Sequence, residues 1–276
     1  MIILLLAVFV VCLYFRFPIA FSLGLSCLVY FIFKGTPLVV VPLKMYAGID
    51  VFILLSIPGF IMAGNLMNQG GLTDRIIDFC NHLLGHVRGG LSYVNISASM
   101  LFAGISGTAI SDTASLGAVM IPAMKKEGYD SDFSCAITAA SSTVGPIIPP
   151  SLPMIIAATL SGLSVGKLFL AGAIPGLLLG LGLMMVAYFV AKKKNYPKHS
   201  KSSLLQILKS FTNTFWALLM TVIILFGIVG GVFTPTEASV VAVLYALFIG
   251  LFVYKKLNLK NISVVVLDSM KTTASL

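Results

Sequence analysis

Long apolar runs separated by short polar segments dominate the chain, and their lengths predict membrane helices. A helix needs about 20 apolar residues to cross a bilayer, with a range of about 17 to 25. Runs that fit this length, the first of them short, cover residues 2–15, 17–33, 49–68, 168–191, 213–232 and 236–254. The pattern predicts an all-α polytopic membrane protein.

Two regions between these runs break the pattern. Residues 89–124 contain "GISGTAISDTAS", which is rich in Gly, Ser and Thr and holds one carboxylate, Asp112. Residues 132–163 are interrupted by "STVGPIIPPS", whose prolines remove backbone donors and block a continuous helix. Irregular backbone at membrane depth is tolerated only where it is buried in protein or lines a wet cavity. A re-entrant hairpin over 89–124 and a broken helix over 132–163 are therefore expected to build a cavity.

The segment before the hairpin has a different periodicity. Over residues 72–88, apolar Leu72, Ile76 and Leu83 alternate at helical spacing with charged Asp74 and Asp78. A helix with one apolar and one charged face lies in the membrane interface. Residues 71–88 are therefore predicted to be an interfacial amphipathic helix.

Composition and charge support this interpretation. The chain is 58% hydrophobic and only 10% charged, against about 25% charged residues in soluble domains. The net charge is +9, and the basic residues lie in short clusters between apolar runs. Such clusters are typical of membrane topology signals and not of a nucleic-acid-binding face. The strongest cluster, "KKKNYPKHSK" at 192–201, is placed in the cytoplasm. Of the 18 Lys and Arg residues, only Lys34, Lys44 and Lys167 then fall outside.

That charge bias requires residues 89–124 to begin and end on the same side. Two full spans would satisfy it, and so would a hairpin. Each arm is short and the middle, "GISGT", is hardly polar, which favours a hairpin whose tip stops near the middle of the membrane.

The two broken elements carry the candidate chemistry. Unwound carbonyls and hydroxyls suit Na⁺, a hard cation that prefers oxygen, while helix N-termini suit an anionic substrate. The expected ion-binding residues are Ser106, Gly107, Thr108, Asp112, Ser142, Thr143 and Gly145.

Each of these residues also has a structural explanation. Serine and threonine in membrane helices often donate to a carbonyl of their own helix. Asp112 could cap the second hairpin arm instead of binding an ion. The motif "GISG" would suit an intramembrane serine protease, but His82, His86 and His199 lie outside the spans, so we expect no enzyme activity.

Three stretches together resemble one family. "FIMAGNLMNQGGLTDRIIDFCNHLLGHVRGGLSYVNISASMLFAGISGTAISDTASLGAVMIPAMKKEGY", "SSTVGPIIPPSLPMIIAATLSGLSVGKLFLAGAIPG" and "GVFTPTEASVVAVLYA" resemble the large membrane (M) subunit of tripartite ATP-independent periplasmic (TRAP) transporters. The resemblance covers about residues 1–270.

The resemblance implies an elevator-type fold with two inverted repeats in the bacterial inner (cytoplasmic) membrane. It implies Na⁺ as coupling ion with no other cofactor. The expected partners are a periplasmic substrate-binding protein, which delivers a small organic anion, and a small four-helix membrane subunit. The broken helix would contribute half of the substrate site, with Ser141, Pro149, Pro150 and Ser151 as candidates.

The expected organisation follows from the same resemblance. It comprises N-terminal scaffold helices (1–70), the interfacial helix (71–88), half of a transport domain (89–163), further transmembrane helices with a cytoplasmic basic loop at 192–212 (164–254), and the start of a cytoplasmic arm (255–276). The family's second hairpin and second Pro-rich break have no counterpart after residue 200, so the second repeat is expected to be missing and transport by this chain alone is doubtful.

Two rival interpretations remain open at this point. The chain could belong to another group of transporters with hairpins and broken helices, such as dicarboxylate or citrate carriers, although "FTPTEA" argues against it. It could also be a truncated membrane protein that does not transport. The sequence does not identify the substrate, which is expected to be a carboxylate or a sialic-acid-like anion.

Overall fold

The computed structural model describes residues 1–275, and all regular elements in that range are helices. The chain divides into two compact units, Met1–Val51 and the part from Phe52 onward. The first unit contains α1 (Ile2–Tyr14), α2 (Ile19–Lys34) and α3 (Val40–Ile49). The second contains η1 (Phe52–Leu55), α4 (Ser56–Gln69), α5 (Leu72–Leu84), α6 (Gly90–Ser106), α7 (Ala109–Lys126), α8 (Ser131–Ser142), α9 (Leu152–Ser161), α10 (Val165–Lys194), α11 (Leu204–Val229), α12 (Pro235–Phe248), the π-helix η2 (Ile249–Val253) and α13 (Leu259–Ser275).

In the first unit, α1 and α2 pack against each other through small residues. Ser22 and Ser26 on α2 are fully buried, and Cys12 on α1 is nearly so. The Ser26 hydroxyl donates to the Ser22 carbonyl at 2.6 Å, so its polar group is satisfied within its own helix. Small residues of this kind let membrane helices approach closely.

Four segments of the described chain are long and apolar enough to cross a membrane. They are Phe52–Gln69, Val165–Lys194, Leu204–Val229 and Pro235–Val253. The predicted spans at 49–68, 168–191, 213–232 and 236–254 correspond to these four. Together with the shorter apolar helices, they make the protein an all-α membrane protein.

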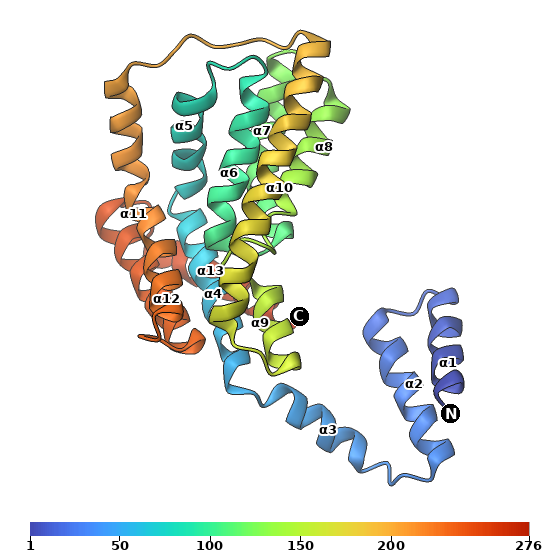
Figure 1. Ribbon diagram of the computed structural model, residues 1–276. Coiled ribbons are helices and arrows are strands. Elements are labelled where there is room, and N and C mark those ends of the chain that lie inside the picture. Colours follow the sequence, from blue (N-terminus) through green and yellow to red (C-terminus); the bar gives the residue numbers. More distant parts are fainter. Residues whose placement is uncertain (276) are drawn as a thin grey trace. The chain divides into compact units, whose positions relative to one another are not determined.

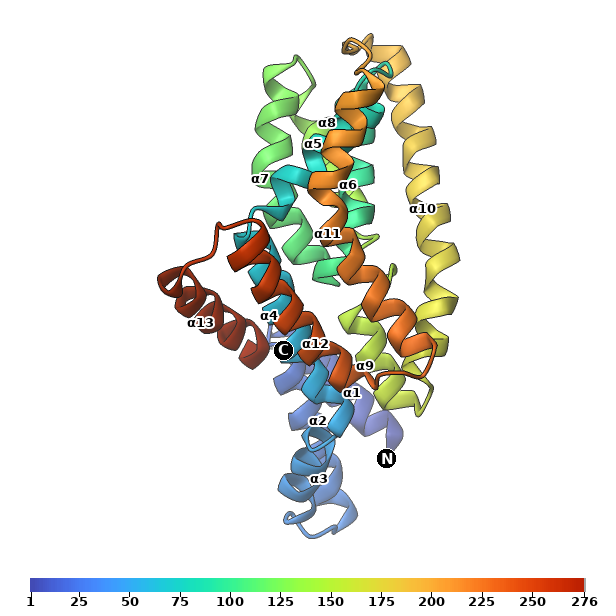
Figure 2. The same ribbon diagram turned by 90° about the vertical axis from the view of Figure 1, so that its left-hand side faces the viewer.

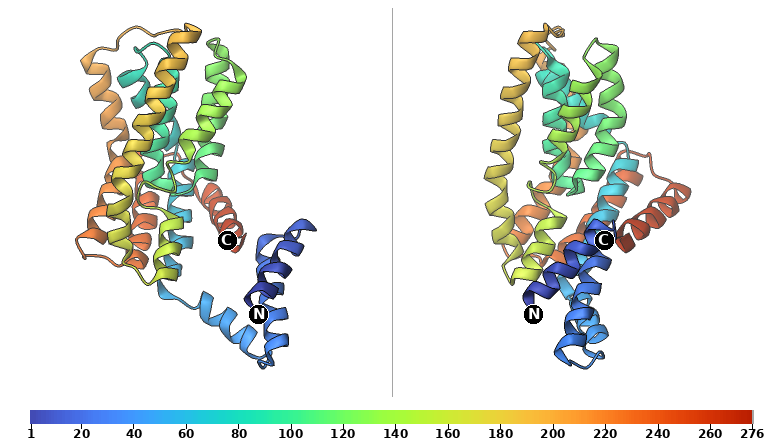
Figure 3. Two further views of the ribbon diagram at one scale, coloured as in Figure 1. Left: turned by 45° about the vertical axis from the view of Figure 1, so that its right-hand side comes forward. Right: turned by 90° about the vertical axis from the view of Figure 1, so that its right-hand side faces the viewer.

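The predicted hairpin is formed by α6 and α7, which are joined only by Gly107 and Thr108. Both outer ends of the hairpin lie at the top of the unit in Figure 1, and its tip lies halfway down. Helix α8 packs against both arms and runs from the top to the level of the tip, where the chain unwinds before α9. Figure 3 shows this arrangement from two further sides. The hairpin tip and the broken helix therefore meet at the same depth.

Helix α10 packs along this assembly through three glycines one helical turn apart. A Cβ at Gly172 would stand 2.6 Å from the Ile147 carbonyl oxygen, and one at Gly176 would stand 2.6 Å from the Ile148 side chain. A Cβ at Gly180 would stand 2.3 Å from the sulfur of Met100 on α6. The glycines thus bring α10 into close contact with both the break and the first hairpin arm.

Two helix boundaries and the C-terminal segment differ from the sequence-based expectation. The basic loop expected at 192–212 is shorter, because α10 continues to Lys194 and α11 begins at Leu204. Ser203 and Gln206 form a capping box that starts α11 early. The segment after residue 255 folds as helix α13, which packs against α4 (Figure 2).

Candidate functional site at the hairpin tip

The hairpin tip is a two-residue turn whose geometry depends on Gly107. This residue ends α6 with a left-handed backbone, at φ 62°, which favours glycine because a side chain there would meet its own carbonyl. Thr108 then begins α7, and its hydroxyl accepts a hydrogen bond from the Ser111 amide at 3.3 Å. Thr108 is therefore the N-cap of the second arm, and the alternative that Asp112 caps it is wrong.

Asp112 lies in the first turn of α7 and is fully buried. One carboxylate oxygen accepts a hydrogen bond from the Ser106 hydroxyl. The other, Oδ2, has no hydrogen-bond partner among the described residues. A buried carboxylate oxygen without a donor is unfavourable. The site therefore offers a negatively charged or strongly electronegative oxygen to a ligand.

The broken helix contacts the hairpin tip through its backbone. The Leu152 amide donates to the Gly107 carbonyl at 3.3 Å. A Cβ at Gly107 would stand 2.7 Å from the Pro150 carbonyl oxygen. The Asp112 Oδ2 atom lies on the other side of the junction, where a Cβ at Gly145 would stand 2.6 Å from it. Glycines at 107 and 145 therefore make the contact between the two broken elements possible.

Several carbonyls in the break accept no hydrogen bond among the described residues. Those of Pro149 and Pro150 belong to this group. Pro153 has no amide hydrogen to donate to the Pro149 carbonyl, and the Met154 amide donates to the Ser151 hydroxyl and not to the Pro150 carbonyl. Carboxylate, hydroxyl and free carbonyl oxygens thus all lie along the contact between the hairpin tip and the break. This donor set fits a hard cation such as Na⁺ better than a soft metal.

Of the expected ion-binding residues, Ser106, Gly107, Thr108, Asp112 and Gly145 come together at the junction. The hydroxyls of Ser142 and Thr143 do not point to it. They donate to carbonyls of their own helix, at 2.8 Å to Thr138 and 2.7 Å to Ala140. For these two side chains the structural explanation from the sequence applies.

The expected substrate residues have different environments. The Ser141 hydroxyl is fully buried between α8 and α6, 2.9 Å from the Ser99 hydroxyl. Ser151 caps α9 by accepting from the Met154 amide at 3.3 Å. Pro149 and Pro150 lie beside the hairpin tip with their free carbonyls.

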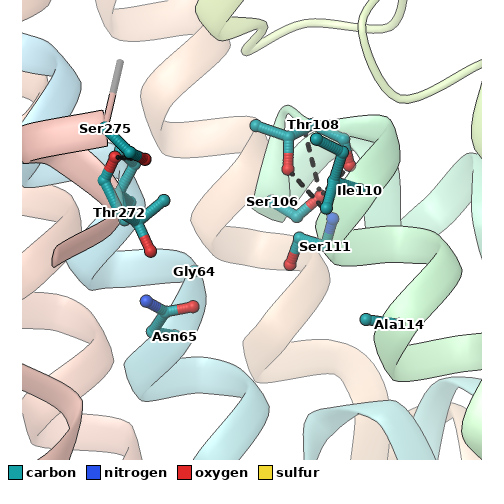
Figure 4. A pocket seen from close by; sticks show the side chains of 10 residues that line it. Gly64, Asn65, Ser106, Thr108, Ile110, Ser111, Ala114, Thr272 and Ser275 are labelled. Carbon is teal, nitrogen blue, oxygen red and sulfur yellow. Dashed lines mark hydrogen bonds between the residues drawn. The ribbon is translucent and has the colours of Figure 1, made fainter. Parts of the chain in front are cut away.

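A cleft of about 360 Å³ opens next to the tip, and sequence reasoning missed part of its lining. Ser106, Thr108 and Ser111 face Gly64 and Asn65 of α4 across it, with Thr272 of α13 beside them (Figure 4). The Asn65 amide donates to Ser269 of α13 at 2.9 Å. An Asn within an apolar helix was the available signal for this residue.

The fold and the site together define a class of protein: an all-α membrane protein in which two broken helical elements bring oxygen ligands together. The family described as "Tripartite ATP-independent periplasmic transporter, DctM component" matches residues 6–276. The chain belongs to this family, which contains the large permease subunits of TRAP transporters. The alternative assignment to a separate group of dicarboxylate or citrate carriers is therefore wrong.

Three relatives document the family. The chain is 43% identical over 269 residues to the sialic acid TRAP transporter permease protein SiaT of Haemophilus influenzae, covering 97% of this chain and 44% of that protein. It is 44% identical to the sialic acid TRAP transporter large permease protein SiaM of Vibrio cholerae, covering 93% and 60%. It is 43% identical to the C4-dicarboxylate TRAP transporter large permease protein DctM of Pseudomonas aeruginosa, covering 92% and 60%. The chain thus spans about half of the length of these relatives.

Proposed function

We propose that this chain is part of the large permease subunit of a Na⁺-coupled TRAP transporter that imports a small organic anion. The support is the family and one observation, the buried Asp112 carboxylate with a free oxygen at the junction of two broken elements. A transporter needs a site that binds its coupling ion from water and releases it again. Broken helices near mid-membrane supply such sites in secondary transporters.

The proposed Na⁺ site uses this chain's own oxygens. Asp112 supplies the charge, and Ser106 and Thr108 supply hydroxyls. Gly107 and Gly145 supply close backbone approach, while Ser142 and Thr143 contribute through backbone carbonyls only, since their hydroxyls are engaged in α8. The bound ion would neutralise the carboxylate and so favour the binding of an anion nearby.

The organic anion is proposed to bind next to the ion, between the N-termini of α7 and α9. Both N-termini carry partial positive charge. The cleft lined by Asn65, Thr108 and Ser111 provides donors on the α7 side. On the other side, Ser151, Pro149 and Pro150 shape the approach to α9, and Ser141 fixes the end of α8 before the break through its bond to Ser99. The relatives named for sialic acid and for C4-dicarboxylates support the proposal that the anion carries a carboxylate.

The remaining parts of the proposal concern the assembly. The fold is proposed to work as one half of an elevator with inverted repeats, embedded in the bacterial inner membrane with the basic ends of α7 and α10 in the cytoplasm. A small membrane subunit and a periplasmic binding protein complete the transporter. The binding protein selects the substrate.

The decisive experiment measures uptake by the complete transporter in liposomes, with its small subunit and binding protein, as a function of Na⁺ concentration. Asp112→Asn should abolish the Na⁺ dependence of uptake. Asp132→Asn, at an exposed carboxylate in the first turn of α8, is the matched control and should behave as the parent. An unchanged Na⁺ half-saturation in Asp112→Asn would show that the carboxylate does not serve the ion.

A further inference from the structure

A small pocket of about 250 Å³ lies at the C-terminal end of α10, which is the upper end of that helix in Figure 1. Its lining residues are Arg88, at the start of the hairpin, and Tyr188 and Lys192 on α10. The pocket therefore brings two cationic side chains and one tyrosine together from segments about 100 residues apart in the sequence.

A backbone contact between Gly89 and α10 brings the Arg88 and Lys192 side chains to the same pocket. Gly89, which follows Arg88, has a left-handed backbone at φ 74° and packs directly on α10, where a Cβ would stand 2.4 Å from the Cβ of Ala191. The Gly89 amide also donates to the Pro197 carbonyl at 3.0 Å. Because Arg88 precedes this contact and Lys192 follows it, their side chains emerge side by side.

No acidic residue compensates this pair within the described chain. Nearby acids are engaged elsewhere: Asp130 lies 3.0 Å from Lys194, and Glu127 lies 2.8 Å from His199. Arg88 and Lys192 form no ion pair or hydrogen bond among the described residues, and both are exposed. Two adjacent like charges repel each other, so an anion between them would stabilise the pocket.

An exposed apolar stripe leads away from the pocket along α10. It consists of residues at alternating spacings of four and three, which places them on one face of the helix. Its members are Ile174, Leu178, Leu181, Met185 and Tyr188, each between 47% and 68% exposed, and the stripe ends at Lys192. A ligand with an anionic head and long apolar tails matches the pocket and the stripe together.

We propose that this pocket binds the phosphodiester headgroup of an anionic phospholipid, with its acyl chains along the exposed face of α10. Arg88 forms charge-assisted hydrogen bonds to two phosphate oxygens, and Lys192 supplies a second positive charge. Tyr188 places its ring at the depth of the headgroup and acyl boundary, where tyrosine is enriched. Basic pockets between membrane helices recognise anionic lipids in this way.

The test compares lipid retention by native mass spectrometry after purification of the transporter from bilayers of phosphatidylglycerol and phosphatidylcholine. The parent should retain phosphatidylglycerol in preference to phosphatidylcholine. The double variant Arg88→Gln, Lys192→Gln should lose most of that retention, by at least about tenfold, as expected for removal of two charge-assisted contacts. Lys193→Gln, at the neighbouring exposed lysine outside the pocket, is the matched control and should retain the lipid.

A second arm distinguishes a lipid from a free anion. The same samples are washed with millimolar inorganic phosphate before measurement. Retention that survives this wash supports a lipid site anchored by acyl chains, whereas displacement by inorganic phosphate would overturn it in favour of a simple anion site. Equal retention by parent and double variant would also overturn the proposal.

Discussion

The free carboxylate oxygen of Asp112 lies against Gly145, so closely that a Cβ at position 145 would stand 2.6 Å from it. The two residues come from different broken elements, the hairpin and the interrupted helix. Position 145 thus fixes how much space remains around the only unbonded oxygen of that carboxylate.

Gly145→Ala should therefore weaken Na⁺ binding without removing any proposed ligand atom. The added methyl group must displace the carboxylate, because the neighbours on its other side are the Ser142 and Thr108 backbone. A loss of about 1.4 kcal/mol in ion binding would raise the Na⁺ half-saturation of uptake tenfold. Gly182→Ala, with open space around its Cβ, is the control and should leave uptake unchanged. A half-saturation equal to the parent's in Gly145→Ala would disprove this role of the carboxylate's surroundings.

Gly107→Ala tests the contact between tip and break. An alanine at φ 62° costs roughly 1–2 kcal/mol from its backbone alone. Gly162→Ala supplies a control with the same backbone strain, at φ 69°, but with nothing within 4 Å of its Cβ. The melting temperature should fall clearly more for Gly107→Ala than for Gly162→Ala, because only the former meets the Pro150 carbonyl. Equal decreases would mean that the tip is not held tightly against the break.

The depth of the hairpin tip is accessible by cysteine labelling in whole cells. Single cysteines at Arg88 and Lys126 should react only from the cytoplasmic side, since both lie at the outer ends of the hairpin. A cysteine at Gly107 should resist a bulky periplasmic reagent because the tip is buried against the break. The background must lack the four native cysteines. Ready labelling at position 107 from the periplasm would favour two full spans with an exterior turn.

The loop after α10 should contribute a pH-dependent part of the stability. Hydrogen bonds from the Tyr196 hydroxyl and from Lys194 hold the pKa of Asp130 below its usual value. A depressed pKa means that this stabilisation is present above the ordinary Asp pKa of about 3.9 and is lost as pH falls through the lower folded value. Tyr196→Phe keeps the ring stacked on Tyr129 but removes the hydroxyl.

Thermal unfolding between pH 7 and pH 3 measures this effect. The melting temperature of Tyr196→Phe should lie below that of the parent at pH 7, and the two should converge as Asp130 becomes protonated. Tyr46→Phe, at an exposed tyrosine of α3, should match the parent throughout. A difference between Tyr196→Phe and the parent that is constant with pH would assign the effect to packing instead.

The hairpin and the break could be predicted from the sequence because their signals are local. Gly107 permits the left-handed backbone that ends α6, and three prolines within five residues, at 146, 149 and 150, leave no room for a continuous helix. Because these signals mark where helices end, the two arms expected within 89–124 match the helices α6 and α7. The early start of α11 also has a local signal, the capping pair Ser203 and Gln206. The predicted span begins only at residue 213 because the length of the apolar run places it there.

The arrangement around Asp112 could not be predicted in the same way. Its neighbour Gly145 lies 33 positions away, and no periodic pattern relates the two. Likewise, Asn65 reaches the cleft only because α4 packs beside the hairpin and α13. The directions of the Ser142 and Thr143 hydroxyls depend on whether α8 continues to residue 142, which the composition of the break leaves open.

The glycines of α10 leave three positions without a side chain on the face of the helix that contacts the break and α6. Gly172, Gly176 and Gly180 are gaps spaced by four residues, or about 6 Å along the axis. Each of these positions receives a group from the break or from α6: the Ile147 carbonyl, the Ile148 side chain and the Met100 sulfur. The positions four residues beyond either end of the series, Leu168 and Met184, carry bulky side chains. A displacement of the junction by four residues along α10 would therefore not restore all three contacts, so the glycines favour a single position of the junction on this helix.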